Sequence, residues 1–334
     1  MSCITMSESG ETEPLAAQTV TLDKDEHAQF HGPYWGELRI DQLSKGPFHA
    51  RIDHGAVGEM MFYRECWNHR LLVRGVGPRD YLIIGVEHRR DFLWNGFSLN
   101  PRKLVLLSTA DEVEFASGDS ADHIVLLVPP TLLRKHVGEA RAEELLRTRS
   151  HLTLADPASR ELARSVGRLL SRVQAGSLTP DNTREAEEAE FELLACLTHS
   201  SGAEMEKSFR EARAKRRKAL LRAVECAQQL KRPKAVPEFA RELGVSQGTL
   251  ESVIKEALDI TPARFLRWSR LNGLKTQLRH AEPEYLRVTE ACHQWGFAEL
   301  GRTAVEYRQL FGESPSETLA GNAQRSAVQP DVGA

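Results

Sequence analysis

Cysteine is scarce in this sequence, and long apolar runs are absent from it. The 334 residues include five cysteines. Because these are widely spaced and odd in number, they predict neither a disulfide framework nor a zinc site. The longest apolar run, residues 124–128, falls far short of the ~20 residues that a membrane-spanning helix needs. Residues 1–18 contain no basic segment followed by an apolar one, so no secretory signal is indicated. We therefore expect a cytoplasmic protein.

Positive charge is concentrated in the last third of the chain. Overall, 44 Lys and Arg residues stand against 47 Asp and Glu residues, for a net charge of −3. Residues 213–325 hold 20 of the basic and 13 of the acidic residues, a net of +7, which leaves −10 for the remainder. This asymmetry is typical of a chain that binds a polyanion; a solvated helical face is the alternative interpretation.

Residues 34–129 carry a strand pattern. Short segments rich in Val, Ile, Leu and aromatic residues recur there, separated by Gly, Pro, Asn and Asp. The predicted strands are residues 48–53, 57–63, 70–74, 80–86, 103–107 and 123–128. Many short strands without intervening helices predict an antiparallel β sandwich or barrel.

The hydrophobic period changes from two to about 3.6 after this region, which indicates helices. They are predicted at residues 131–149, 157–174 and 182–198. The second helix has an apolar stripe formed by Leu162, Val166, Leu169, Leu170 and Val173. Such a stripe packs either into the core of its own domain or against a second copy of the chain, and the sequence leaves both open.

Residues 236–256 have the plan of a helix-turn-helix unit. Gly244 permits the left-handed conformation that ends the first helix, and Ser246 is suited to cap the second. Leu250 and Ile254 lie on one face of that second helix, which leaves its opposite face free to enter a groove of DNA.

Residues 288–312 repeat this plan, with Gly296 at the turn and Gly312 after the second helix. Between the two units, residues 262–279 are predicted to form one helix about 27 Å long. That length is close to the ~34 Å pitch of B-DNA. Two recognition helices held at this separation are able to enter successive major grooves on one face of a duplex.

Several of these segments resemble the AraC/XylS-type transcription regulators. They are Leu243-Gly-Val-Ser246, Ile260-Thr-Pro262, Arg270-Leu271 and, above all, residues 296–319, GFAELGRTAVEYRQLFGESPSETL. The resemblance covers residues 217–321. It implies an effector-binding, cupin-like β domain, helices that dimerise, a bipartite DNA-binding domain and recruitment of RNA polymerase.

The predicted architecture is therefore multidomain α+β. Its parts are a disordered leader (1–20), a β sensor domain (21–130), a helical dimerisation region (131–200), a linker (201–212), an all-α double helix-turn-helix domain (213–321) and a disordered tail (322–334). The predicted function is that of a homodimeric transcription regulator, not an enzyme, which binds double-stranded DNA and senses an unknown small-molecule effector.

The resemblance places the DNA contacts on the exposed faces of the two recognition helices. The expected residues are Ser246, Gln247, Gly248, Thr249, Glu251, Ser252, Lys255, Leu300, Gly301, Arg302, Val305 and Arg308. Four positions depart from the family pattern: Gly248, Glu251 and Ser252 stand where the family usually has basic residues or Gln, and Thr303 is the fourth. Glu251 is able to read a cytosine amine but repels phosphate, and Thr303 stands where the family has an aromatic residue. A degenerate domain that acts through protein contacts is the alternative.

Candidates for effector binding lie in the β region. Phe62 and Trp94 belong to its aromatic residues, which line a pocket or fill a core. Arg70 and Arg74 share one face of a predicted strand. They hold an anionic ligand if that face points inward and are solvated if it points outward.

No metal ion, cofactor or catalytic residue is expected. A metal-binding cupin has paired histidines, whereas here the histidines stand alone: His49, His54, His69, His88 and His123. Residues 244–248 match G-x-S-x-G, but a helix precedes them where a nucleophile elbow needs a strand. The alternative function is that of a cupin-type metalloenzyme with a non-specific or degenerate DNA-binding domain.

Overall fold

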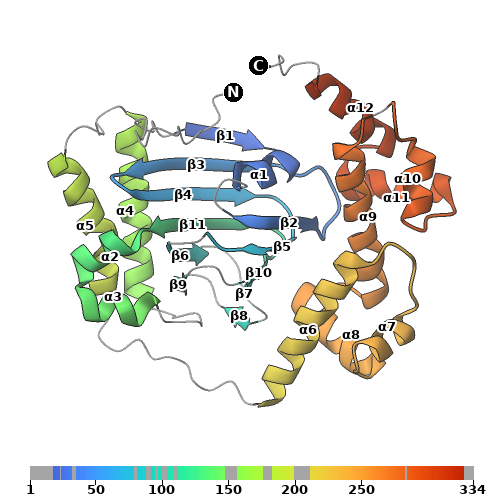
Figure 1. Cartoon of the computed structure of the whole chain (residues 1–334), viewed down its shortest axis with the longest axis horizontal. Helices are drawn as coiled ribbons and strands as arrows, with labels where there is room; N and C mark the ends of the chain where they lie inside the picture. Colours follow the sequence, from blue (N-terminus) through green and yellow to red (C-terminus); the bar gives the residue numbers. More distant parts are fainter. Residues whose placement is uncertain are drawn as a thin grey trace.

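Two antiparallel β-sheets form the centre of the molecule, with one group of helices beside each (Figure 1). The structure is a computed structural model. It describes residues 18–22, 24–31, 35–78, 81–87, 92–94, 97–99, 104–108, 112–146, 156–175, 183–198, 211–282 and 284–326. His88, residues 1–17 of the predicted leader and residues 327–334 of the predicted tail lie outside the described residues.

The first sheet has six strands in the order β1-β3-β4-β11-β6-β9, and each neighbouring pair is antiparallel. The strands are β1 (Gln18–Leu22), β3 (Ala50–Val57), β4 (Met60–Trp67), β6 (Leu82–Glu87), β9 (Leu104–Ser108) and β11 (Ala121–Val128). The register places Glu65 of β4 directly opposite His123 of β11.

The second sheet has five strands in the order β2-β5-β10-β7-β8, again antiparallel. The strands are β2 (Gly36–Gln42), β5 (Leu71–Val76), β7 (Phe92–Trp94), β8 (Phe97–Leu99) and β10 (Glu112–Ala116). The short helix α1 (Lys24–His31) lies between β1 and β2 in the chain.

The two sheets share one apolar core, which confirms the predicted antiparallel sandwich. Ile52 and Leu127 of the six-stranded sheet and Leu71 and Phe115 of the five-stranded sheet belong to the same buried cluster. The likeness to cupins stays a prediction.

Four helices cover the outer face of the six-stranded sheet. They are α2 (Pro130–Val137), α3 (Glu139–Leu146), α4 (Asp156–Gln174) and α5 (Thr183–Thr198). The single helix predicted at residues 131–149 is wrong, because Gly138 has φ 80° and separates α2 from α3.

The apolar stripe of α4 packs within its own chain. Leu162, Val166, Leu169 and Leu170 are buried in one cluster with residues of the six-stranded sheet such as Phe62 and Leu126. The stripe is therefore core rather than a dimer seam; the side chain of Val173 lies outside the described residues.

The C-terminal domain contains seven helices among the described residues. They are α6 (Glu211–Gln229), α7 (Val236–Glu242), α8 (Gln247–Leu258), α9 (Pro262–His280), α10 (Val288–Gln294), α11 (Leu300–Phe311) and α12 (Pro315–Ser326). The two helix-turn-helix units and the helix between them match the predicted ranges closely. Gly244 and Gly296 have φ of 71° and 69°, as the turns require.

Some predicted boundaries differ from the structure. β1 begins at Gln18, inside the predicted leader, and α12 continues to Ser326, inside the predicted tail. Helix α1 and strands β2 and β10 were not predicted. The sequence of α1 is mixed in polarity, whereas β2 and β10 do alternate between polar and apolar residues, so their signal was present and was missed. Among the described residues, no helix is long and apolar enough to cross a membrane.

Candidate functional site

The recognition helix of the first unit, α8, presents a polar face. Ser246 caps it by accepting a hydrogen bond from the backbone N–H of Thr249 at 3.1 Å. On the next turns Gln247, Gly248, Glu251 and Lys255 are exposed, whereas the buried residues of the helix lie on the opposite side. Gln247 Nε2 donates to Glu251 Oε1 at 2.9 Å, which partly shields that carboxylate.

The recognition helix of the second unit, α11, has an exposed face of different chemistry. Gly301, Arg302, Val305 and Arg308 lie on it, with Val305 59% exposed. Arg302 lies 3.6 Å from Glu299 and Arg308 lies 3.0 Å from Glu317, and all four side chains are more than half exposed. Exposed ion pairs of this kind are weak, so both arginines are able to leave them and bind phosphate or base edges.

One predicted contact, Leu300, fits this surface less well, and so does Thr303, which departs from the family pattern. Leu300 is half-buried and packs against the core of the domain. Thr303 is 1% exposed, so its place is in the core and not on the DNA face. The departure from the family's aromatic residue therefore changes packing rather than base reading.

Helix α9 holds the two units together. Arg270 on this helix is buried, donates to the backbone oxygen of Trp295 at 2.9 Å and stacks on the ring of Phe297. Burial, together with the nearby Arg267, lowers the pKa of Arg270 to about 10. Gly273 allows close approach, because a Cβ there would lie 2.0 Å from the Trp295 ring. The second unit is thus fixed on α9 by residues of its turn.

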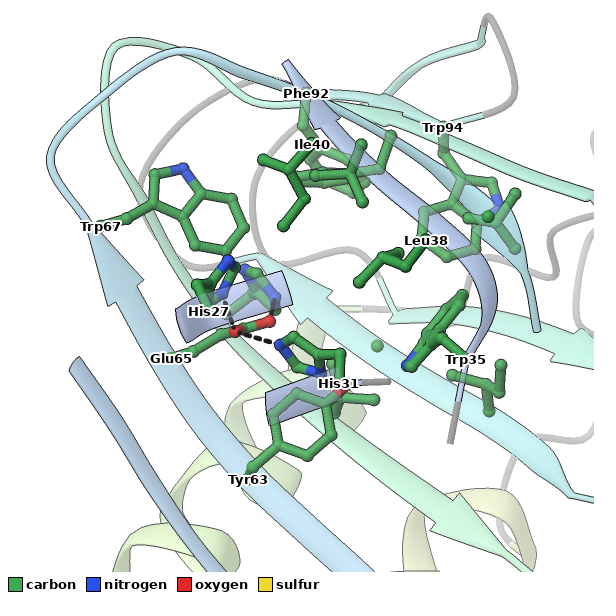
Figure 2. A pocket seen from close by; sticks show the side chains of 18 of the residues that line it. His27, His31, Trp35, Leu38, Ile40, Tyr63, Glu65, Trp67, Phe92 and Trp94 are labelled. Atoms are coloured by element: carbon green, nitrogen blue, oxygen red, sulfur yellow. Dashed lines mark hydrogen bonds and ion pairs between the residues drawn. The ribbon is translucent and has the colours of Figure 1, made fainter. Parts of the chain in front are cut away.

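A cavity lies between the two sheets, beneath α1 (Figure 2). Its volume of about 80 Å³ exceeds the ~10–15 Å³ that one water needs. Apolar side chains form most of the wall: Trp35, Leu38, Ile40, Tyr63, Trp67, Val73, Ile83, Val86, Phe92, Trp94, Val113, Phe115 and Val125. The cavity therefore suits a ligand with an apolar or aromatic body.

One end of the cavity is polar. His27 Nε2 and His31 Nε2 lie 2.8 Å and 3.0 Å from Glu65 Oε2, and His123 Nε2 contacts Glu65 Oε1. Burial opposes ionisation of Glu65, but the three imidazoles hold its pKa well below the usual range. Burial lowers the pKa of His27, against the pull of Glu65.

The prediction that the histidines stand alone is therefore wrong for His123. His27 and His31, which sequence reasoning passed over, complete its cluster. Their spacing of four residues on a helix was the available signal, because positions i and i+4 share a helical face. The helix itself was not predicted, so the signal was missed.

The structure brings one of the four predicted effector residues into the cavity. Trp94 lines it, and its ring packs against Phe115. Phe62 does not, because it is fully buried on the other face of its sheet, under the helices. Arg70 and Arg74 do not line the cavity either, because both side chains reach the C-terminal domain: Arg70 contacts Leu258, and Arg74 lies 4.0 Å from Glu225.

The five-stranded sheet and the loop after β2 contact the C-terminal domain directly. Gln42 and Asn272 exchange two hydrogen bonds, from Gln42 N to Asn272 Oδ1 at 2.8 Å and from Asn272 Nδ2 to Gln42 O at 3.0 Å. Gln42 Nε2 also donates to the backbone oxygen of Leu310 at 2.6 Å, and Arg39 donates to that of Gln228 at 2.7 Å. Buried polar groups are thus paired across the interface.

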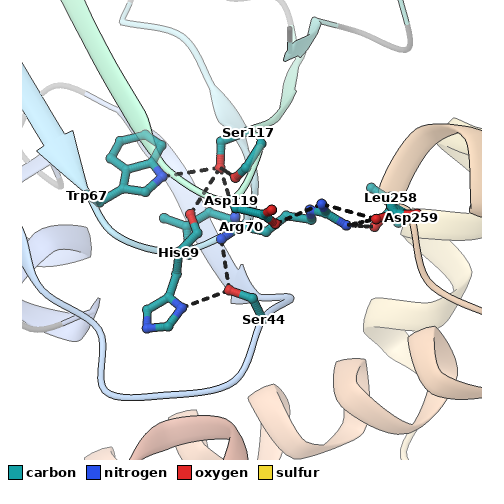
Figure 3. A network of polar contacts seen from close by, with 10 residues as sticks. Ser44, Trp67, His69, Arg70, Ser117, Asp119, Leu258 and Asp259 are labelled. Atoms are coloured by element: carbon teal, nitrogen blue, oxygen red, sulfur yellow. Dashed lines mark hydrogen bonds and ion pairs between the residues drawn. The ribbon is translucent and has the colours of Figure 1, made fainter. Parts of the chain in front are cut away.

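Two sets of hydrogen bonds, joined by the backbone, lie between the cavity wall and this interface (Figure 3). Trp67 Nε1 donates to Ser117 Oγ at 3.2 Å, and Ser117 Oγ accepts from Leu71 N at 2.9 Å. The residue before Leu71 is Arg70, whose Nη1 donates to the backbone oxygen of Leu258, the last residue of α8. The cavity wall and the first recognition helix are thus linked through the Arg70–Leu71 backbone.

Comparisons with known proteins agree with this architecture in the C-terminal part. Residues 239–321 match a helix-turn-helix domain family. The probable thc operon regulatory protein of Rhodococcus erythropolis is 41% identical over 87 residues, 26% of this chain and 26% of that protein. The XylDLEGF operon transcriptional activator of Pseudomonas putida is 31% identical over 90 residues, 27% of this chain and 28% of the activator. The chain thus spans about a quarter of the length of these two relatives.

Two further comparisons extend over most of the chain. XylDLEGF operon transcriptional activator 3 of Pseudomonas putida is 22% identical over 282 residues, 81% of this chain and 82% of that protein. The crystal structure of the AraC-like transcriptional activator CuxR superposes with a TM-score of 0.41 at 15% identity, covering 78% of this chain and 96% of CuxR. In the C-terminal part of the chain, the sequence match coincides with the glycine turns and the helix caps. The chain therefore carries an AraC/XylS-type helix-turn-helix domain in that part.

Proposed function

We propose that this protein is a transcription regulator that binds a specific DNA sequence through both helix-turn-helix units. The observation that carries the proposal is the pair of exposed recognition faces, on α8 and α11, fixed to one helix, α9. The 19 residues of α9 span about 28 Å, close to the ~34 Å pitch of B-DNA. Each recognition helix would enter one of two successive major grooves.

The two faces favour different base contacts. On α11, the guanidinium of Arg302 suits guanine O6 and N7, and the exposed methyl groups of Val305 suit the methyl group of thymine. On α8, Gln247 and Thr249 offer donors and acceptors, and Lys255 suits phosphate. Glu251 favours a cytosine amine and reduces nonspecific affinity by repelling phosphate.

The cavity between the sheets is the proposed effector site. Its apolar wall and its single polar end suit a small molecule with an apolar body and a polar group. Such an effector acts only through different affinities for the DNA-competent and DNA-incompetent arrangements of the chain. The five-stranded sheet is well placed for this, because Leu38 and Ile40 of β2 line the cavity while Arg39 between them bonds to α6.

Homodimerisation and activation through RNA polymerase are further parts of the proposal. Both follow from the resemblance, and the relatives from Pseudomonas putida are named transcriptional activators. With the α4 stripe buried, Phe191 on α5 is the candidate apolar contact for a second copy, since it is 59% exposed. Sedimentation of the wild type and of the Phe191→Ser variant would distinguish monomer from dimer.

Selection of duplexes from a random library by the purified full chain, at near-physiological salt, tests the proposal. We expect enrichment of two sequence blocks about 10 base pairs apart. Arg302→Ala should lose one preferred base, whereas Arg184→Ala on α5, which removes an equally exposed arginine far from α11, should leave the selected sequence unchanged. Salt-sensitive binding with no enriched sequence would contradict specific recognition and support the degenerate alternative.

A further inference from the structure

The polar end of the cavity has the composition of a metal site. His27, His31 and Glu65 each offer one ligand atom, and these atoms lie within 4.8 Å of one another. All three residues are buried. We propose that His27, His31 and Glu65 bind a divalent transition-metal ion, zinc or iron(II), at the polar end of the effector cavity.

Local structure brings the three ligands together. His27 and His31 are four residues apart on α1, so their rings project from the same helical face toward β4 (Figure 2). Glu65 lies on β4 and points into the space between the sheets, where it meets both imidazoles. Two histidines one helical turn apart and a carboxylate from another element form a His₂Glu set, which binds zinc or iron(II) in other proteins.

The distances fit a metal ion after a small separation of the ligands. Two ligand atoms bound to one tetrahedral zinc at ~2.0–2.1 Å lie about 3.3 Å apart. The Nε2 atoms of His27 and His31 lie 2.8 Å and 3.0 Å from Glu65 Oε2. These two distances would have to lengthen by a few tenths of an ångström to admit the ion, and all three ligand atoms already lie within 4.8 Å of one another.

The charge of the cluster also favours a cation. Among the described residues, the only ion-pair partners of the buried Glu65 are the three histidines. No lysine or arginine within the described part of the chain compensates this carboxylate, although a buried charge is costly without a partner. A divalent ion would supply that charge.

The protons of the two histidine rings would have to move when a metal ion binds. Glu65 Oε2 accepts a hydrogen bond from Nε2 of each ring, so without an ion the carboxylate holds both rings with the proton on Nε2. Nδ1 of His27 and Nδ1 of His31 are buried and have no hydrogen-bond partner among the described residues. A ring that binds the ion through Nε2 would carry its proton on Nδ1 instead.

His123 has a separate role in this arrangement. Its Nε2 contacts the other carboxylate oxygen of Glu65, from the strand directly opposite. A group that holds a ligating carboxylate from behind is a positioning residue, and its loss typically weakens metal binding by about 10–100-fold. We therefore expect substitution of Glu65 to abolish metal binding and substitution of His123 only to weaken it.

The open side of the site faces the cavity. Three protein ligands leave at least one coordination position vacant, as in catalytic zinc sites. The surrounding wall is apolar, with Tyr63, Trp67 and Trp35 nearest the cluster in Figure 2. The ion would therefore take an oxygen or nitrogen donor of an apolar effector, which deepens the proposed effector site without depending on DNA binding.

Titration of the metal-stripped full chain with Co²⁺ tests the site directly. We expect one Co²⁺ per chain, with visible absorption of a low-coordinate nitrogen and oxygen site, displacement by Zn²⁺ and a higher unfolding temperature with Zn²⁺ bound. Glu65→Gln should abolish this binding, and His123→Gln should weaken it by about 10–100-fold. His49→Ala, which removes an exposed histidine of the same domain, should leave it unchanged.

Three results would overturn the proposal. The first is wild-type protein that gives no Co²⁺ spectrum and no shift in unfolding temperature with Zn²⁺; the cluster is then only a hydrogen-bonded network. The second is a Glu65→Gln variant that binds as tightly as the wild type, because the ion then sits elsewhere. The third is equal loss in His49→Ala, which would indicate surface binding. The wild-type titration decides even if a variant fails to fold, and none of these readouts depends on DNA.

Discussion

Arg70 donates a hydrogen bond from Nη1 to the backbone oxygen of Leu258 at 2.5 Å. Leu258 is the last residue of the first recognition helix, where carbonyl groups lack partners and the helix dipole is negative. The same guanidinium lies 2.8 Å from Asp119 of the β domain and 3.5 Å from Asp259. One arginine thus joins the β domain to the end of α8.

Replacing Arg70 should loosen this connection. Arg70→Ala removes a largely buried charged donor, so we expect a loss of about 1–2 kcal/mol in the free energy of unfolding. Arg70→Lys keeps the charge but loses the forked geometry and should fall between wild type and alanine. Urea unfolding of the full chain measures both, with Arg184→Ala as the surface control. An Arg70→Ala variant as stable as that control would show that the contact contributes nothing to docking.

A methyl group at Gly273 should destabilise the C-terminal domain. Alanine is normally about 1 kcal/mol better than glycine inside a helix. At this position its Cβ would lie 2.0 Å from the Trp295 ring, so we expect Gly273→Ala to cost about 1–3 kcal/mol. Gly167→Ala in α4 is the matched control, because nothing lies within 4 Å of its Cβ and the substitution should stabilise. Thermal unfolding of both variants would show opposite shifts.

Arg302 and Glu251 should affect DNA binding in opposite ways. Arg302→Ala should cost about 1–3 kcal/mol of binding and relax the preference at one base pair if the guanidinium grips a guanine. Glu251→Gln removes a charge that repels phosphate, so it should raise affinity for unrelated duplexes and narrow the ratio of specific to nonspecific binding. Fluorescence anisotropy at several salt concentrations measures both. A uniform loss for Arg302→Ala with a shallower salt slope would instead make it a phosphate contact.

The C-terminal domain was predictable because its signals are local. Turn glycines such as Gly244, the cap at Ser246 and the helical period of α9 each act within a few residues of sequence. The antiparallel β class followed in the same way from short apolar segments and turns. Local sequence did not predict which face of each strand points into the core, because register and sheet order depend on distant partners.

The cavity shows the limit of this reasoning. Phe62 and Trp94 are both aromatic strand residues, yet the first packs under helices and the second lines the cavity. The direction of the Arg70 side chain depends on a domain interface that could not be predicted from the sequence. The cluster around Glu65 joins α1, β4 and β11, three elements far apart in the chain, so only the spacing of His27 and His31 within α1 pointed to it.

His69 should contribute to acid instability. Burial lowers its pKa, helped by His49 and opposed by the hydrogen bond to the Pro47 carbonyl. The unfolded chain, with a histidine pKa of about 6.5, therefore takes up the proton first as pH falls. The stability is fully present above pH ~6.5 and is lost as pH drops from there toward the lower folded pKa. The unfolding temperature should accordingly fall between about pH 7 and pH 5.

The variant His69→Gln separates this residue from the other histidines. A glutamine amide is able to donate to Pro47 O and accept from Ser44 Oγ, the two partners of the His69 ring, but it does not titrate. The fall in unfolding temperature with pH should be shallower in this variant. His27 and His54 also have pKa values lowered by burial, so part of the fall should remain. An unchanged pH profile would exclude His69 as a contributor.

Substitutions at Trp67 and Arg70 should have coupled effects on the free energy of unfolding. Trp67→Phe keeps an aromatic ring in the cavity wall but removes the N–H that donates to Ser117 Oγ at 3.2 Å. We expect a loss of about 0.5–1.5 kcal/mol in unfolding free energy. Ser117 also accepts from Leu71 N, and Leu71 follows Arg70 in the chain, so the two positions are linked through the backbone.

A double-mutant cycle with Arg70→Ala measures this coupling. Residues in one hydrogen-bond network typically show interaction energies of about 0.5–3 kcal/mol, whereas independent positions add. A nonzero interaction energy would support the path from the cavity through Ser117 to the end of α8. Additive effects within about 0.5 kcal/mol would mean that the cavity wall and the Arg70 contact respond independently. An effector would then have to reach the recognition helices by another route, of which the Arg39–Gln228 contact from β2 to α6 is the next candidate.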